Sequence, residues 1–164
     1  MRSVFAGAMD IKPGSIASNI YASCASERRG RETMIGGTAE EARRILVVED
    51  DDVARELVRL ALERHGYDVL VAEDGLRGYE LALQQRPDLI VTDVSMPAAD
   101  GVHLIRRVRD TAEIAQTPVL VITGYGTGSA TFTLAQGADA YEPKPIDPQS
   151  FLATVRRLLE KRSA

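Results

Sequence analysis

The sequence predicts an α/β domain with three layers: a doubly wound, five-stranded parallel sheet and five helices. Two observations support this prediction. From residue 44 onward, short continuous apolar runs alternate with segments of helical periodicity, and a polar side chain follows most of the apolar runs. Continuous apolar runs are typical of strands buried on both faces, and strands that alternate with helices form parallel βαβ units.

The first strand and helix lie between residues 45 and 66. The apolar run at 45–48 predicts a buried strand, and residues 52–65 have helical spacing. Asp52 is expected to be the N-cap of this helix and Gly66 its C-cap. The apolar face of the helix is expected to consist of Val53, Leu57, Leu60 and Ala61.

The pattern repeats through the middle of the chain. Residues 67–71 predict the second strand. Asp74 can then N-cap a helix that ends before Pro87, because the residue before a proline disfavours helical geometry. This helix carries Leu76, Tyr79 and Leu83. The third strand is expected at 89–92, and the helix after it is marked by Val102, Ile105 and Val108.

The last part of the chain completes the alternation. The fourth strand is expected at 119–122, a threonine-rich helix at 129–136 and a brief fifth strand at 140–142. Asp147 and Pro148 form an N-cap followed by proline at the first helical position, which opens the final helix. Its inward face is expected to hold Phe151, Val155, Leu158 and Leu159. Lys161 and Arg162 suit its negative C-terminal end.

Composition restricts the function. The 164 residues carry a net charge of −4 with a pI near 5.3, which argues against binding nucleic acid through phosphate neutralisation. No apolar run reaches the roughly 18–20 residues that cross a bilayer, so no membrane insertion is expected. The lone Cys24 excludes an internal disulfide. These features predict a cytoplasmic protein.

Residues 1–41 differ from the rest of the chain. They are rich in Ser, Gly and Ala and lack a sustained apolar period, which predicts a disordered N-terminal extension ahead of a domain at 42–164. A docking tail is the functional alternative. Met34 offers a third interpretation, in which translation begins just before the folded part.

Polar residues follow four of the five predicted strands. Glu49 and Asp50 follow the first, Asp93 the third and Thr123 the fourth, and Lys144 lies just past the fifth. Ligands of open parallel sheets bind outside the carboxyl ends of the strands. Three carboxylates held together repel unless a cation neutralises them, and an all-oxygen set suits Mg²⁺. A lysine and a hydroxyl beside a carboxylate are the groups that phosphoryl transfer to an aspartate requires.

These segments resemble the four motifs of response-regulator receiver domains from two-component signalling. The motifs are ILVVEDDD, DLIVTDVSMPAADG, VLVITGYG and GADAYEPKP, in that order, and the resemblance covers residues 44–162. It implies a chemotaxis-regulator-like, flavodoxin-like fold with strand order 2-1-3-4-5. It also implies that Asp93 accepts a phosphoryl group from a sensor histidine kinase or a histidine phosphotransfer protein.

The resemblance assigns further roles. Glu49 and Asp50 correspond to the acidic pair that binds Mg²⁺ with Asp93 and the backbone carbonyl of Ser95. Thr123 corresponds to the switch hydroxyl and Lys144 to the lysine that pairs with the phosphoryl group. The resemblance also implies that Tyr141 occupies the aromatic switch position. It further implies a cis peptide between Lys144 and Pro145, because the corresponding peptide is cis in the family.

The chain departs from the family pattern in three places. The segment between Thr123 and Lys144 is about one residue shorter than is common, and its glycines are expected to loosen it. Pro143 is expected to limit pairing at the end of the fifth strand. Ser95 and Tyr125 occupy positions that tune phosphate lifetime in relatives.

We expect a stand-alone signalling domain rather than an enzyme, acting on an unknown downstream protein or passing its phosphate onward in a phosphorelay. The main alternative is a pseudo-receiver that binds partners without phosphorylation. A phosphatase with an aspartate nucleophile would need a second acid where this chain has Ser95. A flavodoxin would need a Ser/Thr/Gly-rich loop after the first strand, where the acidic run at 49–52 would repel a flavin phosphate.

Overall fold

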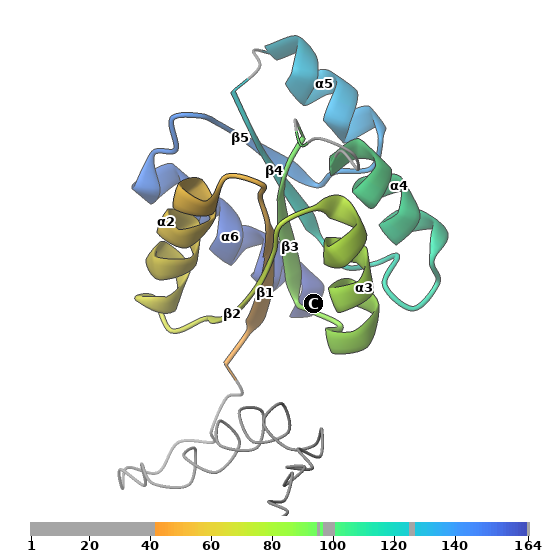
Figure 1. Ribbon diagram of the computed structural model, residues 1–164, viewed down its shortest axis with the longest axis horizontal. Coiled ribbons are helices and arrows are strands. Elements are labelled where there is room, and N and C mark those ends of the chain that lie inside the picture. The colour runs from red at the N-terminus through yellow and green to blue at the C-terminus, as the bar shows by residue number, and fades with distance from the viewer. Residues whose placement is uncertain (1–41, 95, 97–100, 125–126, 164) are drawn as a thin grey trace, which may run out of the picture. The chain divides into compact units, whose positions relative to one another are not determined.

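A five-stranded parallel sheet forms the centre of the part of the chain that the computed structural model describes, residues 42–94, 96, 101–124 and 127–163 (Figure 1). The strand order is β2-β1-β3-β4-β5, which confirms the predicted fold. The strands are β1 (Arg44–Val48), β2 (Asp68–Ala72), β3 (Leu89–Asp93), β4 (Val119–Thr123) and β5 (Ala140–Pro143). The helices are α2 (Asp52–Glu63), α3 (Gly75–Gln85), α4 (Gly101–Asp110), α5 (Thr127–Ala135) and α6 (Pro148–Ser163). The predicted extension 1–41 lies outside the described residues and stays a prediction.

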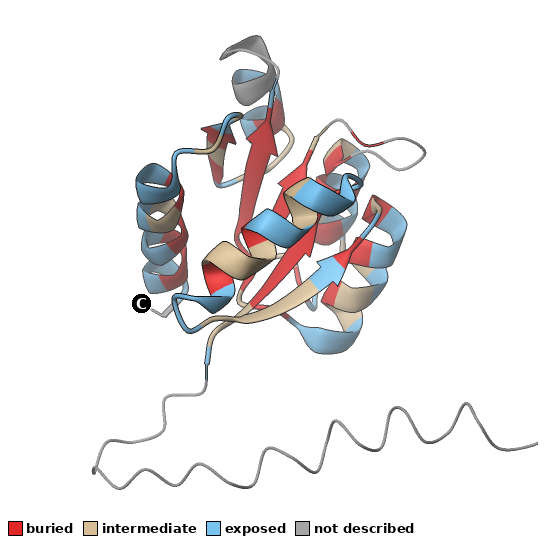
Figure 2. Cartoon of the chain, turned by 60° about the vertical axis from the view of Figure 1, so that its left-hand side comes forward, coloured by how far each residue is buried: buried red, intermediate tan, exposed pale blue. Residues whose placement is uncertain are grey.

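The sheet separates two apolar cores. Alternate residues of β1, β3 and β4 pack with α2 and α6 on one face and with α3 and α4 on the other. The three central strands are buried almost throughout, which explains their continuous apolar sequences (Figure 2). The order of connections reverses between β1 and β3, and ligands of such sheets bind at the carboxyl ends of the strands beside this point. The site is therefore expected where β1 and β3 end.

Helix α2 corrects three details of the sequence prediction. Its N-cap is Asp51, whose carboxylate accepts a hydrogen bond from the Ala54 amide at 2.7 Å, rather than Asp52. Its last residue is Glu63, and Gly66 lies beyond the helix in a left-handed turn with φ of +86°. The buried residues of α2 are Val58 and Leu62, which the predicted apolar face did not include.

The predicted apolar face of α2 is only partly correct. Val53 and Leu57 are 68% and 63% exposed. Leu60 and Ala61 are half-buried. The helix is apolar on two adjoining strips, and periodicity does not distinguish the strip that packs on the sheet from the one beside it.

Helix α3 packs through small residues. Its N-cap is Asp74, as predicted, with the carboxylate accepting from the Arg77 amide at 2.7 Å. A Cβ on Gly78 would lie 2.8 Å from a methyl of Val48, so glycine allows this helix to approach the sheet closely. Leu76, expected to be a marker of the packed face, is 51% exposed.

The end of the chain agrees with the prediction at α6 and differs at β5. Asp147 caps α6 by accepting from the Ser150 amide at 2.7 Å, and the four predicted apolar residues are all buried. Pro143 does not end the pairing: it is in register with Thr123, and the Lys144 amide donates to the Thr123 carbonyl at 2.9 Å. β5 is an edge strand, where a missing N–H is tolerated.

Candidate functional site

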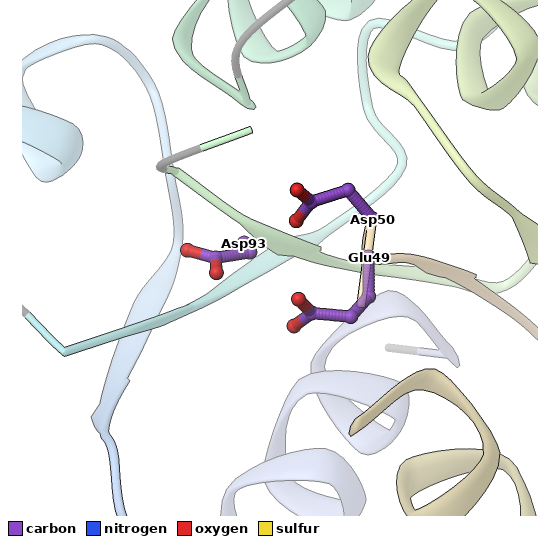
Figure 3. Close-up of side chains that lie close together, drawn as sticks. All are labelled: Glu49, Asp50 and Asp93. Atoms are coloured by element: carbon purple, nitrogen blue, oxygen red, sulfur yellow. The ribbon is translucent and has the colours of Figure 1, made fainter. Parts of the chain in front are cut away.

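Three carboxylates meet at the carboxyl end of the sheet. Glu49 and Asp50 directly follow β1, and Asp93 is the last residue of the neighbouring strand β3. One oxygen from each carboxylate lies within 4.8 Å of the others (Figure 3). Glu49 and Asp93 are buried, with 5% and 8% exposure, whereas Asp50 is exposed. The sheet therefore brings together the acids that the sequence predicted would converge.

The local sequence around Asp93 allows a close approach of backbone segments. Helix α4 begins at Gly101, whose amide donates to the Val94 carbonyl at 3.3 Å. A Cβ at this position would lie 2.0 Å from the Asp93 carbonyl oxygen, so a side chain cannot be accommodated. Glycine thus lets α4 start directly beside the acid.

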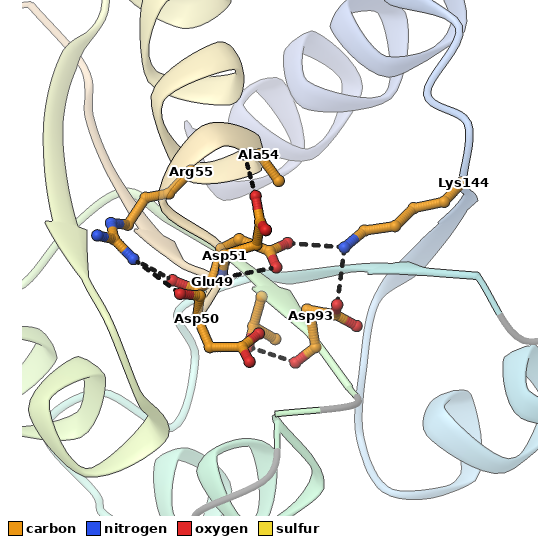
Figure 4. A network of polar contacts seen from close by, with 8 residues as sticks. Glu49, Asp50, Asp51, Ala54, Arg55, Asp93 and Lys144 are labelled. Carbon is orange, nitrogen blue, oxygen red and sulfur yellow. Dashed lines mark hydrogen bonds and ion pairs between the residues drawn. The ribbon is translucent and has the colours of Figure 1, made fainter. Parts of the chain in front are cut away.

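Lys144, which directly follows β5, bonds to two of the carboxylates. Its Nζ lies 2.7 Å from Oδ2 of Asp93 and 2.8 Å from Oε2 of Glu49 (Figure 4). The Lys144–Pro145 peptide that follows is cis, as the family resemblance implied. One ammonium group therefore bridges two buried carboxylates from different strands.

The charges of this cluster do not balance. Burial raises the pKa of the Glu49 carboxyl, and the hydrogen bond and charge of Lys144 only partly oppose this effect. Burial lowers the pKa of Lys144, but its hydrogen bonds to Asp93 and Glu49 outweigh burial and hold that pKa above its ordinary value. The lysine thus stays charged and pairs with two carboxylates, Glu49 and Asp93, while the carboxylate of Asp50 lies close to both. A further cation would relieve the remaining repulsion.

The donor set fits Mg²⁺. All three side chains offer carboxylate oxygens, and the exposed Asp50 keeps one side of the cluster open to water. Mg²⁺ retains several waters and binds through a few carboxylates rather than in a closed cage. Ser95 and Tyr125 lie outside the described residues. The predicted metal ligand at the Ser95 backbone carbonyl, and the predicted role of both residues in phosphate lifetime, therefore stay predictions.

The two predicted switch residues lie on the two strands that follow β3 across the sheet. Thr123 is fully buried and ends β4, next to β3 in the sheet. Tyr141 is half-buried on β5, in register with Val121. Successive residues of a strand face opposite sides, so Tyr141 faces away from the side of Glu142, which bonds to Ser150 and Thr154 of α6.

Two features of the site were not predicted from the sequence. Arg55 of α2 donates to the backbone carbonyl of Glu49 at 2.7 Å. A basic residue one helical turn after an acidic run was the available signal.

An apolar groove of about 450 Å³ also runs between α2 and the start of α6 and ends at Glu49 and Lys144. Its apolar lining consists of Ala54, Leu57, Val58, Ala61, Pro145, Ile146, Pro148, Phe151 and Leu152.

Fold and site together define a receiver domain of a two-component response regulator. A family model described as the response regulator receiver domain matches residues 45–156, and the chain belongs to this family. Phosphorylation on an aspartate and Mg²⁺ binding are typical of the family. In the part of the chain that the structure describes, no helix is long and apolar enough to span a bilayer.

Known proteins agree with this assignment. The chain is 41% identical over 119 residues to the DNA-binding dual master transcriptional regulator RpaA of Synechocystis, covering 72% of this chain and 49% of that protein. It is also 41% identical over 121 residues to response regulator MprA of Mycobacterium sp. strain KMS, covering 73% and 52%. The chain thus spans about half the length of these curated relatives.

Solved structures match over nearly their whole length. A putative response regulator from Chloroflexus aurantiacus superposes with a TM-score of 0.71 at 30% identity, covering 73% of this chain and 99% of that one. The chemotaxis response regulator CheY4 of Vibrio cholerae gives a TM-score of 0.67 at 30% identity, covering 71% and 98%.

Proposed function

We propose that Asp93 accepts a phosphoryl group in an Mg²⁺-dependent reaction and that the chain works as a response regulator. The observation that carries the proposal is the cluster itself: three carboxylate oxygens lie within 4.8 Å of one another, and Lys144 bonds directly to Asp93. Core packing does not require such a concentration of charge, and burying it costs free energy. A phosphoryl group and a divalent cation account for every member of the cluster.

Each residue has a distinct part in the transfer. A carboxylate oxygen of Asp93 attacks phosphorus, the O–P bond forms as the P–N bond to the donor histidine breaks, and the imidazole leaves with the bonding electrons. The bond from Lys144 to Asp93 supports a role for this lysine in pairing with the phosphoryl oxygens. Mg²⁺ held by Glu49, Asp50 and Asp93 would neutralise charge on the transferring group.

The phosphodonor is proposed to be a sensor histidine kinase or a histidine phosphotransfer protein that approaches along the α2–α6 groove. The groove is lined by apolar residues and ends at Glu49 and Lys144, so a partner seated in it would lie next to the site. Leu57 is 63% exposed at this groove, which makes it available for contact.

The response is proposed to be a change on the α5–β5–α6 surface. The added charge and oxygen atoms of the phosphoryl group draw Thr123 and Lys144 inward, and Tyr141 on β5 then repacks. Tyr141→Ala is expected to retain phosphorylation and to alter the capture of partner proteins. Loss of phosphorylation itself with unchanged partner capture would contradict this role.

We propose protein partners, rather than nucleic acid, for the receiver domain. The DNA-binding activity named for the Synechocystis relative belongs to a protein of which this chain covers 49%. The chain carries a net charge of −4, which disfavours a phosphate-neutralising surface. A salt-sensitive shift of duplex DNA by this chain would argue against the proposal.

Incubation with acetyl phosphate and Mg²⁺ tests the function. Intact-mass measurement is expected to show the addition of one phosphoryl group, which Asp93→Asn and chelation of Mg²⁺ should each abolish. Asp88→Asn, at the opposite end of the sheet, is the matched control and should retain the addition. An unmodified wild-type protein, or an addition that survives Asp93→Asn, would favour the pseudo-receiver alternative.

Two further measurements separate the remaining alternatives. Turnover of a phosphate monoester is expected to stay at background, whereas an aspartate-nucleophile phosphatase would exceed it.

Leu57→Glu is expected to slow phosphorylation by a panel of histidine kinases while leaving the acetyl phosphate reaction unchanged, because the small donor does not need the groove. Equal slowing of both reactions would place Leu57 in the fold rather than at the partner interface.

A further inference from the structure

Arg55 holds the backbone of the two acids that follow β1. Its side chain, only 19% exposed, folds back from α2 over the acidic loop (Figure 4). One guanidinium nitrogen, Nη1, donates to the Glu49 carbonyl at 2.7 Å and to the Asp50 carbonyl at 3.4 Å. The other, Nη2, pairs with the carboxylate of Asp52.

These bonds complete a frame around the loop. On one side, the Glu49 amide donates to the Ala72 carbonyl of β2 at 3.1 Å. On the other, Asp51 is fixed as the N-cap of α2. Arg55 supplies the bond to the Glu49 carbonyl between these two anchors, and this carbonyl belongs to the peptide that joins the two acids. Holding that peptide plane restricts the directions in which both side chains leave the backbone.

Two physical effects of Arg55 on a bound cation have opposite signs. A guanidinium near a cluster of carboxylates repels Mg²⁺, so its charge alone weakens binding. Its hydrogen bonds preorganise the ligands, which strengthens binding, because Mg²⁺ demands near-octahedral geometry and tolerates little displacement. Because Arg55 bonds to backbone carbonyls and not to the carboxylates of Glu49 or Asp50, we expect geometry to prevail.

We propose that Arg55 is a positioning residue for the metal site: by holding the Glu49 and Asp50 carbonyls it aims their carboxylates at Mg²⁺. This inference rests on the proposed Mg²⁺-dependent function and extends it to a residue that touches neither the metal nor the phosphoryl group. The fork of the guanidinium reaches two carbonyls and one carboxylate together, a geometry that a lysine ammonium does not reproduce.

Mg²⁺ titration of the full chain by isothermal calorimetry tests the proposal. Arg55→Gln is expected to weaken Mg²⁺ binding about tenfold, the lower end of losses from outer-shell substitutions. Arg55→Lys keeps the charge and should still bind severalfold more weakly. The matched control is Arg59→Gln, which removes the same charge from the same helix; among the described residues, Arg59 bonds to the side chains of Glu56 and Glu63. It should stay within about twofold of wild type.

A kinetic readout separates positioning from a general loss of structure. In the acetyl phosphate reaction, Arg55→Gln should raise the Mg²⁺ concentration for half-maximal rate about tenfold while the rate at saturating Mg²⁺ stays within about twofold. If Arg55→Gln does not fold, Arg55→Lys carries the same test, and its unchanged affinity would then refute the proposal.

The outcomes distinguish this inference from the proposed function. Unchanged or tighter Mg²⁺ binding by Arg55→Gln would overturn the positioning role, because charge removal alone predicts tighter binding. Wild-type protein that binds Mg²⁺ but is not phosphorylated would overturn the function and leave the positioning role standing. Wild-type protein that binds no Mg²⁺ would overturn both.

Discussion

The two ends of the sheet are both rich in charge, but they use it differently. At the amino end, each carboxylate of the ion-pair set has an arginine partner: the pairs are Arg43–Asp88, Arg44–Asp68, Arg109–Asp139 and Arg162–Asp88. Two of these acids also accept backbone amides, Asp88 from Arg44 at 2.9 Å and Asp139 from Val119 at 2.8 Å. This end is electrostatically satisfied by the protein alone.

At the carboxyl end, the same types of group are left out of balance. Glu49, Asp50 and Asp93 lie together, and Lys144 bonds to two of them. The buried members are Glu49 and Asp93, where unbalanced charge is most costly. The difference indicates that the amino end stabilises the fold, whereas the unbalanced carboxylates of the carboxyl end are what the proposed binding of a cation and a phosphoryl group requires.

Removing Lys144 should have the largest effect on this imbalance. Lys144→Ala leaves two buried carboxylates without their cation, and we expect the free energy of unfolding in EDTA to fall by about 1–3 kcal/mol. Mg²⁺ should restore more stability to this variant than to wild type, since the site becomes more negative. Urea unfolding with EDTA and with Mg²⁺ measures both effects. Lys161→Ala, on the exposed last turn of α6, is the control, and an equal loss there would remove the contrast between the two ends.

Asp50 offers the next largest effect. Asp50→Asn removes one ligand without disturbing a salt bridge, and we expect Mg²⁺ to bind at least tenfold more weakly, about 1.4 kcal/mol. Calorimetric titration provides the measurement. Asp88→Asn makes the same chemical change at the amino end and should leave Mg²⁺ affinity unchanged. If both variants bound Mg²⁺ as wild type does, Asp50 would not be a ligand.

A substitution at the amino end should lower stability and leave phosphorylation unchanged. Asp139→Ala removes the acceptor of the Val119 amide and the partner of Arg109, so we expect a loss of about 1 kcal/mol in the free energy of unfolding. Phosphorylation of Asp93 by acetyl phosphate should keep its wild-type rate. Thermal unfolding and intact-mass kinetics on one preparation measure both. A slowed reaction in a stable variant would show that the two ends are coupled.

The same contrast explains what the sequence could predict. The order of elements follows from the alternation of strand and helix patterns, which is read from residues close in sequence. The convergence at one edge of Glu49, Asp50, Asp93, Thr123 and Lys144 follows from the rule for the carboxyl ends of parallel strands. The strand ends were correct to about one residue. The family resemblance, carried by four ordered motifs, is confirmed by the matched family model.

Details that depend on packing could not be predicted. The predicted face of α2 included Val53 and Leu57, which are exposed, and omitted Val58 and Leu62, which are buried, because periodicity alone does not orient a helix on its sheet. The N-cap of α2 is Asp51 rather than the predicted Asp52, because either aspartate of the acidic run satisfies the sequence rule for an N-cap.

The role of Arg55 also escaped prediction. The sequence shows a basic residue one helical turn after an acidic run, but the two backbone carbonyls to which Arg55 donates carry no sequence signal. Pairing through Pro143 was underestimated for a similar reason: whether a missing amide matters depends on β5 being the edge strand. In both cases the decisive partner is a main-chain group or a neighbouring strand rather than a side chain in a motif.

The smallest expected effect is the pH dependence that the imbalance produces. Because burial raises the pKa of Glu49, the folded protein binds this proton more tightly than the unfolded chain does. Without metal, its contribution to stability is therefore complete below the ordinary value of 4.5 and is lost as the pH rises through the raised value. Mg²⁺ favours the ionised carboxylate and opposes this loss.

The gain in melting temperature from Mg²⁺ should accordingly grow as the pH rises from about 4.5 toward 7. Glu49→Gln should flatten part of this rise, because the amide has no proton to release. Glu142→Gln is the matched control: Glu142 is also buried, but it bonds to Ser150 and Thr154 rather than facing the cluster. Differential scanning calorimetry at fixed ionic strength measures the slopes. An identical rise in wild type and Glu49→Gln would mean that Glu49 does not ionise on metal binding, and the imbalance would then reside in Asp50 and Asp93 alone.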